Sequence, residues 1–149
     1  MNIRNFTKSD LNNLYSTLSD SDVMKYIEPP YSFEKTEGFL NDVALADHPL
    51  IYAVEDDSGN YIGYVIYHDY DEESKELGWL LNKQEWGKGY ASTLTKLMIE
   101  MTRKAKKDAV IECDPEQTVT RHIAEKFGFV YEGNVDGCDV FRLKHHENV

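Results

Sequence analysis

Apolar positions change their spacing several times along the first third of the chain. Residues 1–6 alternate apolar and polar side chains and predict a short strand. Residues 7–18 carry leucines at helical spacing behind a threonine in the N-cap position, and residues 32–44 repeat this pattern behind a serine. Pro29-Pro30 separates the two segments, because proline interrupts regular structure. The sequence therefore predicts one strand followed by two helices.

The middle of the chain is rich in residues that favour strands. Residues 50–55 and 61–68 are β-branched and aromatic runs on either side of the turn-forming run 56–60, and this pattern predicts a hairpin. The acidic segment 69–74 is expected to form a loop, and residues 75–82 a third strand. Three neighbouring strands of one sheet are the simplest interpretation.

The rest of the chain alternates between helices and strands. A long helix is expected from Gly89, with one apolar stripe formed by Leu94, Leu97, Met98, Met101 and Ala105. Residues 109–114 predict a buried strand, and a further helix is expected to start at the capping acid Asp114. The inner face of that helix is expected to hold Val119, Ile123 and Phe127. Two closing strands at 129–133 and 139–144 complete the order β-α-α-β-β-β-α-β-α-β-β, which predicts an α+β or mixed α/β fold.

Length and composition fit one globular domain. The chain has 149 residues, of which 41% are apolar and 29% are charged. No apolar run reaches the ~18–20 residues that a membrane helix needs, and the N-terminus lacks the apolar segment of a signal peptide. Cys113 and Cys138 have neither metal-ligand nor redox spacing. Two reduced thiols in a cytoplasmic protein are expected, although a disulfide between them is also compatible with the sequence.

The net charge narrows the choice of partners. A formal charge of −11 disfavours nucleic acid, whose phosphates need neutralisation by lysine and arginine. The same charge suits a cationic amine as substrate, or it serves solubility alone. No membrane partner is expected, and nothing in the sequence decides between a monomer and a homodimer.

The segment with the clearest chemistry joins the third predicted strand to the long helix. Gly87 and Gly89 lie in this loop, directly before the helix N-terminus. Glycines let the backbone approach a ligand closely, and free amides at a helix N-terminus attract anions such as a pyrophosphate. A P-loop would need glycine at position 82 and a hydroxyl residue at 89, and neither is present. A dinucleotide-binding loop would follow a βαβ unit rather than a hairpin.

Three separated motifs resemble one known family. The loop Gln84-x-x-Gly87-x-Gly89 between strand and helix is similar to the coenzyme A loop of the GNAT superfamily of N-acetyltransferases. The segments 76–79 and 86–91, the early segment 23–32 and the run Glu125-Lys126-Phe127-Gly128-Phe129 resemble the branch that contains the ribosomal-protein N-terminal acetyltransferases. The resemblance covers nearly the whole chain.

The resemblance implies a single N-acetyltransferase domain over residues 1–149. Its fold would be a splayed mixed sheet of about six to seven strands with about four helices, and its acetyl donor would be acetyl-CoA. Backbone groups of the strand end would line the pantetheine arm, and loop amides would hold the pyrophosphate. The residues implied in binding the cofactor are Trp79, Leu80, Leu81, Gln84, Gly87, Lys88, Gly89, Tyr90, Ala91, Ser92, Gln117 and Thr120. Trp86 either covers the coenzyme or packs the loop onto the sheet.

The expected reaction is direct attack of a neutral amine on the thioester. It needs a base for the ammonium proton, and Glu112 is the first candidate because some members of the superfamily carry a base glutamate there. Glu76 is the second candidate, and His68, whose side chain titrates in the useful range, is the third. A tyrosine that the family often uses as general acid is replaced by Ala124. A backbone amide near Leu81 could stabilise the oxyanion.

Three aromatic side chains before the second helix, Tyr26, Tyr31 and Phe33, are expected to wall the acceptor pocket, or else to belong to the core. The acceptor is expected to be a small-molecule amine or a peptide or protein N-terminus. A non-catalytic acyl-CoA-binding sensor or regulatory module is the alternative. The adjacent histidines of the tail, His145 and His146, would point to opposite faces of a strand, so no metal is expected.

Overall fold

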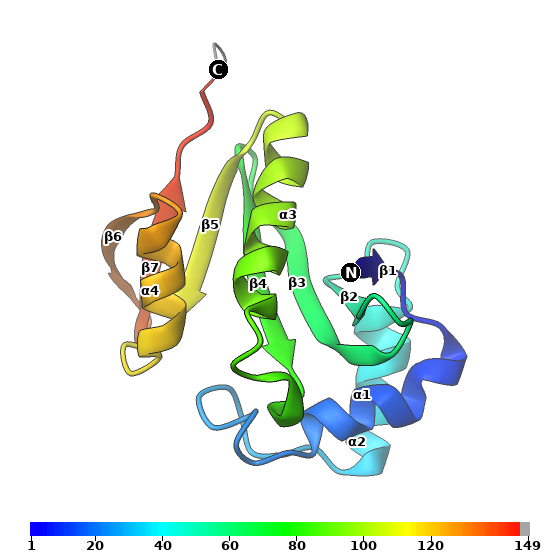
Figure 1. The fold of residues 1–149 in the computed structure, drawn as a ribbon. Helices are drawn as coiled ribbons and strands as arrows, with labels where there is room; N and C mark the ends of the chain where they lie inside the picture. Colours follow the sequence, from blue (N-terminus) through cyan, green and yellow to red (C-terminus); the bar gives the residue numbers. More distant parts are fainter. Residues whose placement is uncertain (147–149) are drawn as a thin grey trace. The chain divides into compact units, whose positions relative to one another are not determined.

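The chain folds into two compact units, and two of its strands contribute residues to both. A computed structural model describes residues 1–146; the first unit holds residues 1–66 and 79–90, and the second holds 67–78 and the chain from Ala91 onward. Over the described residues, seven strands form one mixed sheet in the order β1-β2-β3-β4-β5-β7-β6, accompanied by four α-helices (Figure 1). The predicted mixed α/β fold is thereby confirmed.

The first unit combines the N-terminal helices with an antiparallel part of the sheet. β1 pairs with β2, where Ile3 lies opposite Val54, and β2 pairs with β3, where Val54 lies opposite Gly63. The elements of this unit are β1 (Asn2–Arg4), a 3-10 turn (Lys8–Asp10), α1 (Leu11–Leu18), α2 (Phe33–Phe39), a π turn (Leu40–Ala44), β2 (Ile51–Glu55), the first part of β3 (Tyr61–Asp71), the end of β4 (Ser74–Leu81) and a 3-10 turn (Lys83–Glu85).

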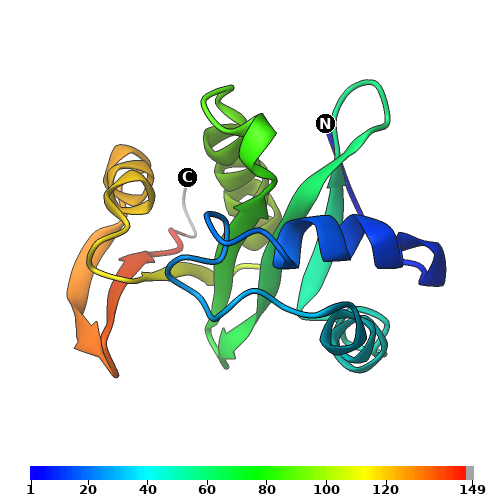
Figure 2. The same ribbon diagram turned by 90° about the horizontal axis from the view of Figure 1, so that it is seen from below.

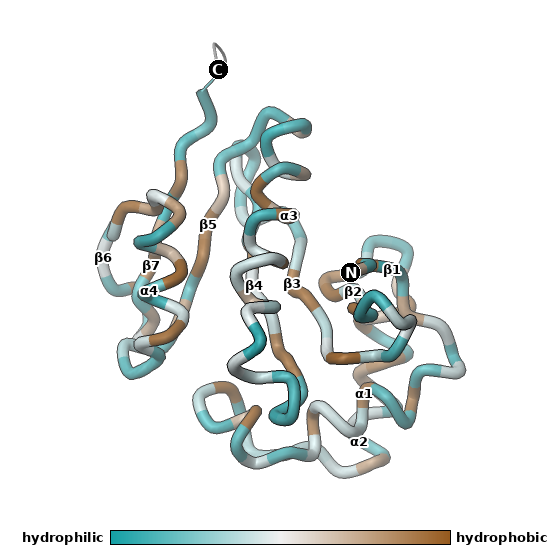
Figure 3. Tube along the Cα trace, in the orientation of Figure 1, coloured by the Kyte–Doolittle hydropathy of each residue, from teal (hydrophilic) through white to brown (hydrophobic). Residues whose placement is uncertain are grey.

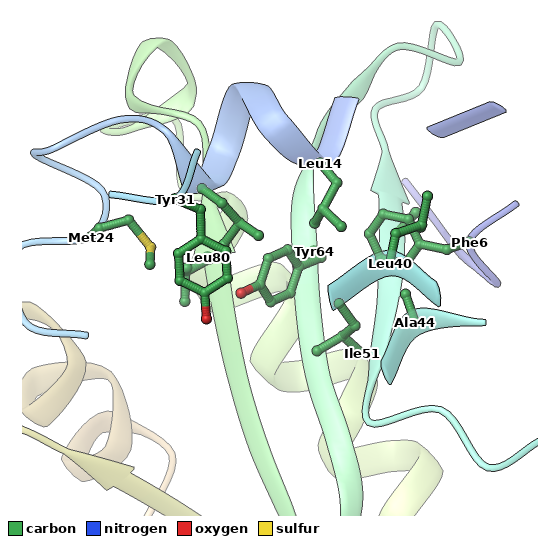
Figure 4. Packing of buried hydrophobic residues seen from close by; sticks show 11 residues of the cluster. Phe6, Leu14, Met24, Tyr31, Leu40, Ala44, Ile51, Tyr64 and Leu80 are labelled. Carbon is green, nitrogen blue, oxygen red and sulfur yellow. The ribbon is translucent and has the colours of Figure 1, made fainter. Parts of the chain in front are cut away.

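One apolar cluster forms the core of the first unit. Leu14 of α1, Leu40 of the π turn and Ile51 of β2 meet Tyr64 and Leu80 there, and all five side chains are buried (Figure 4). Burying aliphatic and aromatic side chains of this size stabilises a fold by about 1.5–3 kcal/mol each. The core therefore ties the end of β4 to the N-terminal helices.

The N-terminal turn is held by an ion pair between a partly exposed arginine and a buried aspartate. The carboxylate of Asp10, which is 3% exposed, accepts hydrogen bonds from the Arg4 guanidinium at 2.8 and 2.9 Å and from the Thr7 amide at 2.8 Å. The last bond is one half of the capping arrangement predicted from Thr7. These contacts hold the pKa of Asp10 well below its ordinary value, mainly through Arg4 and then through Thr7 and Asn13.

The second unit joins a parallel strand pair to an antiparallel one. β4 and β5 run parallel, and β5 continues the sheet through antiparallel pairs with β7 and of β7 with β6. Figures 1 and 2 show α3 and α4 on the same face of these strands, and Figure 3 shows the apolar middle of β5. Its complete elements are β5 (Asp108–Cys113), α4 (Thr118–Lys126), β6 (Val130–Val135) and β7 (Cys138–Leu143); α3 (Tyr90–Lys104) belongs to it from Ala91 on.

Two predicted boundaries are wrong. The acidic segment after residue 68 forms no long loop, because β3 continues to Asp71 and β4 starts at Ser74. The last helix begins at Thr118 rather than at Asp114. Residues 114–117 form a separate turn, in which the Asp114 amide donates to the Gln117 side chain at 2.8 Å and the Gln117 amide donates to the Asp114 carbonyl at 2.9 Å.

Two predicted apolar faces are also partly wrong. In α3, Met101 is 39% exposed, whereas Thr95 and Thr102 are buried. Both threonine hydroxyls donate to the carbonyl four residues earlier, which satisfies them inside the core. In α4, Val119 is 69% exposed while Ile123 is buried. None of the helices over residues 1–146 is long and apolar enough to cross a membrane.

We predict that Gly63→Ala destabilises the protein strongly. The φ of Gly63 is +145°, and a Cβ there would lie 2.2 Å from the Leu80 carbonyl oxygen. Because backbone atoms cannot give way cheaply, the free energy of unfolding should fall by about 3 kcal/mol or more in urea denaturation. Gly38→Ala is the control, since its Cβ would meet nothing within 4 Å and the site is helical. An equal effect of both substitutions would contradict this account.

We predict that Asp10→Asn makes stability less dependent on pH. The pKa of Asp10 is lowered by folding, so its contribution is present above the unfolded pKa of ~3.9 and is lost as the pH falls below that value. The free energy of unfolding of Asp10→Asn should be lower by about 2–4 kcal/mol at pH 7 and should change less between pH 5 and pH 2. Asp42→Asn, at an exposed carboxylate, should keep the full pH dependence.

Candidate functional site

The loop after β4 contains two glycines with positive φ angles. The φ angles of Gly87 and Gly89 are +79° and +80°, values that residues other than glycine rarely adopt. The loop leaves the sheet at Asn82, whose amide donates to the Ile62 carbonyl at 2.9 Å. α3 starts at Tyr90, directly after the second glycine. A glycine loop thus leads straight into a helix N-terminus, which is where anionic groups are stabilised.

Trp86 ties the loop to the end of β4. Its indole Nε1 donates to the Leu81 carbonyl at 2.9 Å, although the side chain as a whole is 49% exposed. This contact supports the packing role, which was one of two roles open for Trp86. Lys88 lies between the two glycines, and its ammonium group pairs with Glu85 at 3.0 Å. The positive charge of the loop is therefore partly compensated inside the first unit.

A buried polar network fixes the start of the loop to α1. Asn82, which is 6% exposed, accepts a hydrogen bond from the Thr17 hydroxyl at 2.6 Å and donates to Ser16 at 3.3 Å. Thr17 also contacts the Tyr61 hydroxyl at 2.8 Å. Buried polar groups that are satisfied in this way hold one conformation. No sequence pattern predicts this network, because Thr17 and Asn82 are 65 residues apart along the chain.

The three aromatic residues predicted for the acceptor pocket occupy different environments. Tyr31 is buried in the core cluster beside Leu80 of β4, and its hydroxyl donates to Glu28 at 2.6 Å (Figure 4). Burial, followed by Glu28, raises the pKa of Tyr31 to about 12. Phe33 is 44% exposed and packs edge-on against Tyr15. Tyr26 is half-buried, with an ammonium group of the preceding lysine over its ring. Tyr31 therefore lies in one cluster with Leu80, at the end of β4.

The two glutamates that are candidate bases lie close together in the second unit, and the third candidate, His68, lies beside one of them. Glu76 of β4 is in register with Val110 of β5, and Glu112 follows two residues later, so both glutamates occupy the same face of the sheet. The Tyr70 hydroxyl donates to Glu112 Oε1 at 2.9 Å, and His68 Nε2 lies 3.8 Å from Glu76 Oε2. We call these four residues the carboxylate cluster.

The carboxylate cluster faces away from the helices of its unit. Phe141 of β7 is in register with Ile111, and Arg121 of α4 lies over its ring. Tyr67 of β3 contacts Thr102 of α3 at 3.0 Å. Because neighbouring strand residues point to opposite faces, Glu112 and Tyr70 lie on the face opposite to α3 and α4. That face of the second unit is where an acceptor could approach the two carboxylates.

The electrostatics of the cluster raise the pKa of one of its carboxyl groups, that of Glu76. Burial raises the pKa of Glu76, His68 opposes this shift, and the charge of Glu112 adds to it. The pKa of Tyr70 rises to about 12, chiefly because its hydroxyl bonds to Glu112. Burial and the same charge also raise the pKa of the Cys138 thiol. Like-charged carboxylates in one site often share a proton, an arrangement found at acid–base centres.

The remaining predicted residues are divided between the units. Trp79, Leu80, Leu81 and Gln84 lie at the end of β4 and in the following 3-10 turn, whereas Ala91 and Ser92 form the first turn of α3. Gln117 precedes α4, and its side-chain oxygen accepts from the Asp114 amide; Thr120 lies in the first turn of that helix. Ala124 is fully buried, so its site leaves no room for a tyrosine.

Tyr70 is the residue that sequence reasoning missed. The segment after residue 68 was expected to be a loop, in which the direction of a side chain is not defined. A strand that continues to Asp71 places Tyr70 on the same face as His68, because residues two apart share a face.

Cys113 and Cys138 are both unpaired. Among residues 1–146, no three His, Cys, Asp or Glu side chains form a group that could hold a metal ion.

Comparison with known proteins identifies the family. The model of the acetyltransferase (GNAT) domain matches residues 1–130. The chain is 29% identical over 140 residues to an uncharacterized N-acetyltransferase of Bacillus subtilis, YnaD, with 91% of this chain and 82% of that protein covered. The crystal structure of a GNAT-family acetyltransferase from Bacillus anthracis is similar with a TM-score of 0.81 and 27% identity, covering 94% of this chain and 90% of that one.

A second solved structure has a described ligand. It is the spermidine N-acetyltransferase from Vibrio cholerae in complex with CoA and spermine, with a TM-score of 0.78 and 26% identity over 95% of this chain and 92% of that one. The family match spans both units and includes the glycine loop and both glutamates. These relatives favour an enzyme over a non-catalytic sensor. The glycine loop and the matched length together show that the chain belongs to the GNAT family of acetyltransferases and is an acyltransferase.

Proposed function

We propose that the protein transfers an acetyl group from acetyl-CoA to a primary amine of a small cationic molecule of the polyamine type. The carboxylate cluster is the observation that carries this proposal. Two glutamates on adjacent strands, one of them with a raised pKa, offer both a proton acceptor and negative charge for a cationic acceptor. The acceptor ammonium loses one proton to the base, and the free amine attacks the thioester carbonyl. The C–N bond forms, the C–S bond breaks, the nitrogen releases a second proton, and the coenzyme A thiolate takes one.

The glycine loop supports acetyl-CoA as donor. Gly87 and Gly89 have positive φ angles and no side chain, so the backbone there can come close to a ligand, and α3 follows at once. Such an arrangement suits a pyrophosphate, and the relative from Vibrio cholerae is described with CoA bound. The remaining predicted donor contacts, including those of Gln117 and Thr120, stay predictions. When bound, acetyl-CoA would supply the activated acetyl group, and the chain would bind and orient it.

Glu112 is the preferred base within the cluster. Its carboxylate accepts a hydrogen bond from Tyr70 at 2.9 Å, which fixes the position of one of its oxygens. Glu76 lies 3.8 Å from His68 Nε2, beyond hydrogen-bond distance, and is the second candidate. A tyrosine acid is not needed for departure of the coenzyme, because a thiol of pKa ~8.5 is a good leaving group.

A small cationic acceptor is supported by charge and by one relative. The chain carries a net charge of −11, and the Vibrio cholerae relative is described with spermine. The motifs shared with the ribosomal-protein N-terminal acetyltransferases favour a peptide N-terminus instead, and this remains the second candidate. An α-amine with a pKa of ~7.7–8.0 would need a weaker base than a side-chain amine at ~10.4.

The wider context of the protein also remains a proposal. We propose that residues 1–149 form a single N-acetyltransferase domain, because the family match includes residues of both units. The two unpaired cysteines are consistent with a cytoplasmic location. A monomer and a homodimer both fit this function, which needs neither nucleic acid nor a membrane.

We predict that the protein releases free thiol from acetyl-CoA fastest with polyamines. The panel would hold spermidine, spermine, amino acids, aminoglycosides and short peptides, and Glu112→Gln should lower kcat by about 100-fold or more. Glu132→Gln, on β6 and facing Arg142, is the matched control and should retain activity. Thiol release with peptides alone would favour the N-terminal acceptor, and full activity of Glu112→Gln would remove Glu112 as the base.

We predict that Gly87→Ala weakens acetyl-CoA binding more than its effect on folding explains. Gly59, in the β2–β3 hairpin, has almost the same φ as Gly87, +81° against +79°, and neither Cβ would meet an atom within 4 Å. Both substitutions should therefore cost about 1 kcal/mol of stability. Only Gly87→Ala should raise the KM for acetyl-CoA, by about tenfold. Equal KM values in the two variants would argue against the loop as donor site.

A further inference from the structure

We infer that Tyr70 is a positioning residue, whose hydrogen bond holds the Glu112 carboxylate in place and thereby makes Glu112 rather than Glu76 the base. Glu112 would take the acceptor proton. The inference rests on the proposed function, because it concerns the base of that reaction. It adds a residue that neither the glycine loop nor the motifs of the sequence point to.

The geometry gives each carboxylate a different partner from β3. Tyr70 Oη lies 2.9 Å from Glu112 Oε1, within hydrogen-bond distance. His68 Nε2 lies 3.8 Å from Glu76 Oε2, too far for a hydrogen bond but close enough for an electrostatic interaction. His68 and Tyr70 are two residues apart on β3. Glu76 of β4 is in register with Val110 of β5, which lies two residues before Glu112. The pairing therefore follows from the register of the sheet.

The Glu112 carboxylate accepts a hydrogen bond from the Tyr70 hydroxyl and has no ion pair among the described residues. Within residues 1–146 the Glu112 side chain has no lysine or arginine partner, and its hydrogen bond comes from Tyr70. The thiol of Cys138 on β7 lies close enough to be affected by its charge, as does Glu76 on β4. Arg142 of β7 bonds to Asp108 and Glu132 instead. Removing the hydroxyl would leave a carboxylate among acidic neighbours.

The alternative is that Tyr70 donates its proton to the departing thiolate. The pKa of Tyr70 is raised to about 12, whereas a thiol has a pKa of ~8.5. Transfer from the phenol to the thiolate would therefore be uphill, and the neutral phenol would remain a hydrogen-bond donor through the working pH range. The geometry points to support of the base rather than to acid catalysis.

The test is the pH dependence of kcat/KM with the best amine of the panel. In Tyr70→Phe the acidic limb should move to higher pH by about one unit, which is a tenfold loss of rate on that limb with little change at the plateau. Tyr67→Phe is the matched control, because it removes another hydroxyl from β3 that bonds to Thr102 on the other face. Its acidic limb should stay where it is.

The substitution Glu76→Gln should move the acidic limb of the kcat/KM profile in the opposite direction. Glu76→Gln removes a negative charge beside Glu112, so the acidic limb should move to lower pH. Thermal unfolding of each variant checks that the fold is retained. A Tyr70→Phe profile that moves no more than that of Tyr67→Phe would overturn the inference while leaving the enzyme intact. Absence of thiol release from the unaltered protein with every amine would overturn the proposed function, and the inference with it.

Discussion

The close approach of β3 and β4 at Gly63 determines where the glycine loop starts. The Leu80 carbonyl lies where a side chain of residue 63 would be, so the two backbones are closer than any other residue would permit. From this contact the strand continues to Asn82, whose amide bonds to Ile62 and whose side chain bonds to Thr17 of α1. The loop therefore leaves the sheet from a position fixed by backbone and buried polar contacts.

The same constraint connects the core to the candidate donor site. Leu80 belongs to the apolar cluster of the first unit and meets Tyr31 there, while the carbonyl of Leu81 accepts from Trp86. Packing on one side of β4 and the loop contact at its end thus hold the residues whose backbone is proposed to line the donor. Substitutions in the N-terminal helices would affect the loop through Thr17 and Leu80 before they affected any ligand directly.

The periodicity of the sequence predicted most of the fold, because helices and strands here follow their apolar spacing. It misplaced the inner stripe of α3, because buried threonines bond back to the helix backbone and look polar in a sequence. It misplaced the start of α4, because the Gln117 side chain closes a turn on the Asp114 amide and delays the helix. The glycine loop could be recognised because its chemistry is local. The Thr17–Asn82 network and the Tyr70–Glu112 bond could not, since each joins residues brought together only by strand register or helix packing.

The carboxylate cluster also bears on how an acidic protein could handle an anionic donor and a cationic acceptor. The donor loop carries a lysine that is partly compensated by Glu85, and its attraction for phosphate rests on backbone amides rather than on net charge. Within the second unit, Glu76 and Glu112 lie on the sheet face opposite to α3 and α4. A cation bound beside two carboxylates would stabilise their ionised forms, so its arrival would itself lower the affinity of the pair for a proton. A proposed polyamine acceptor would in this way prepare the base that deprotonates it, which a neutral acceptor could not do.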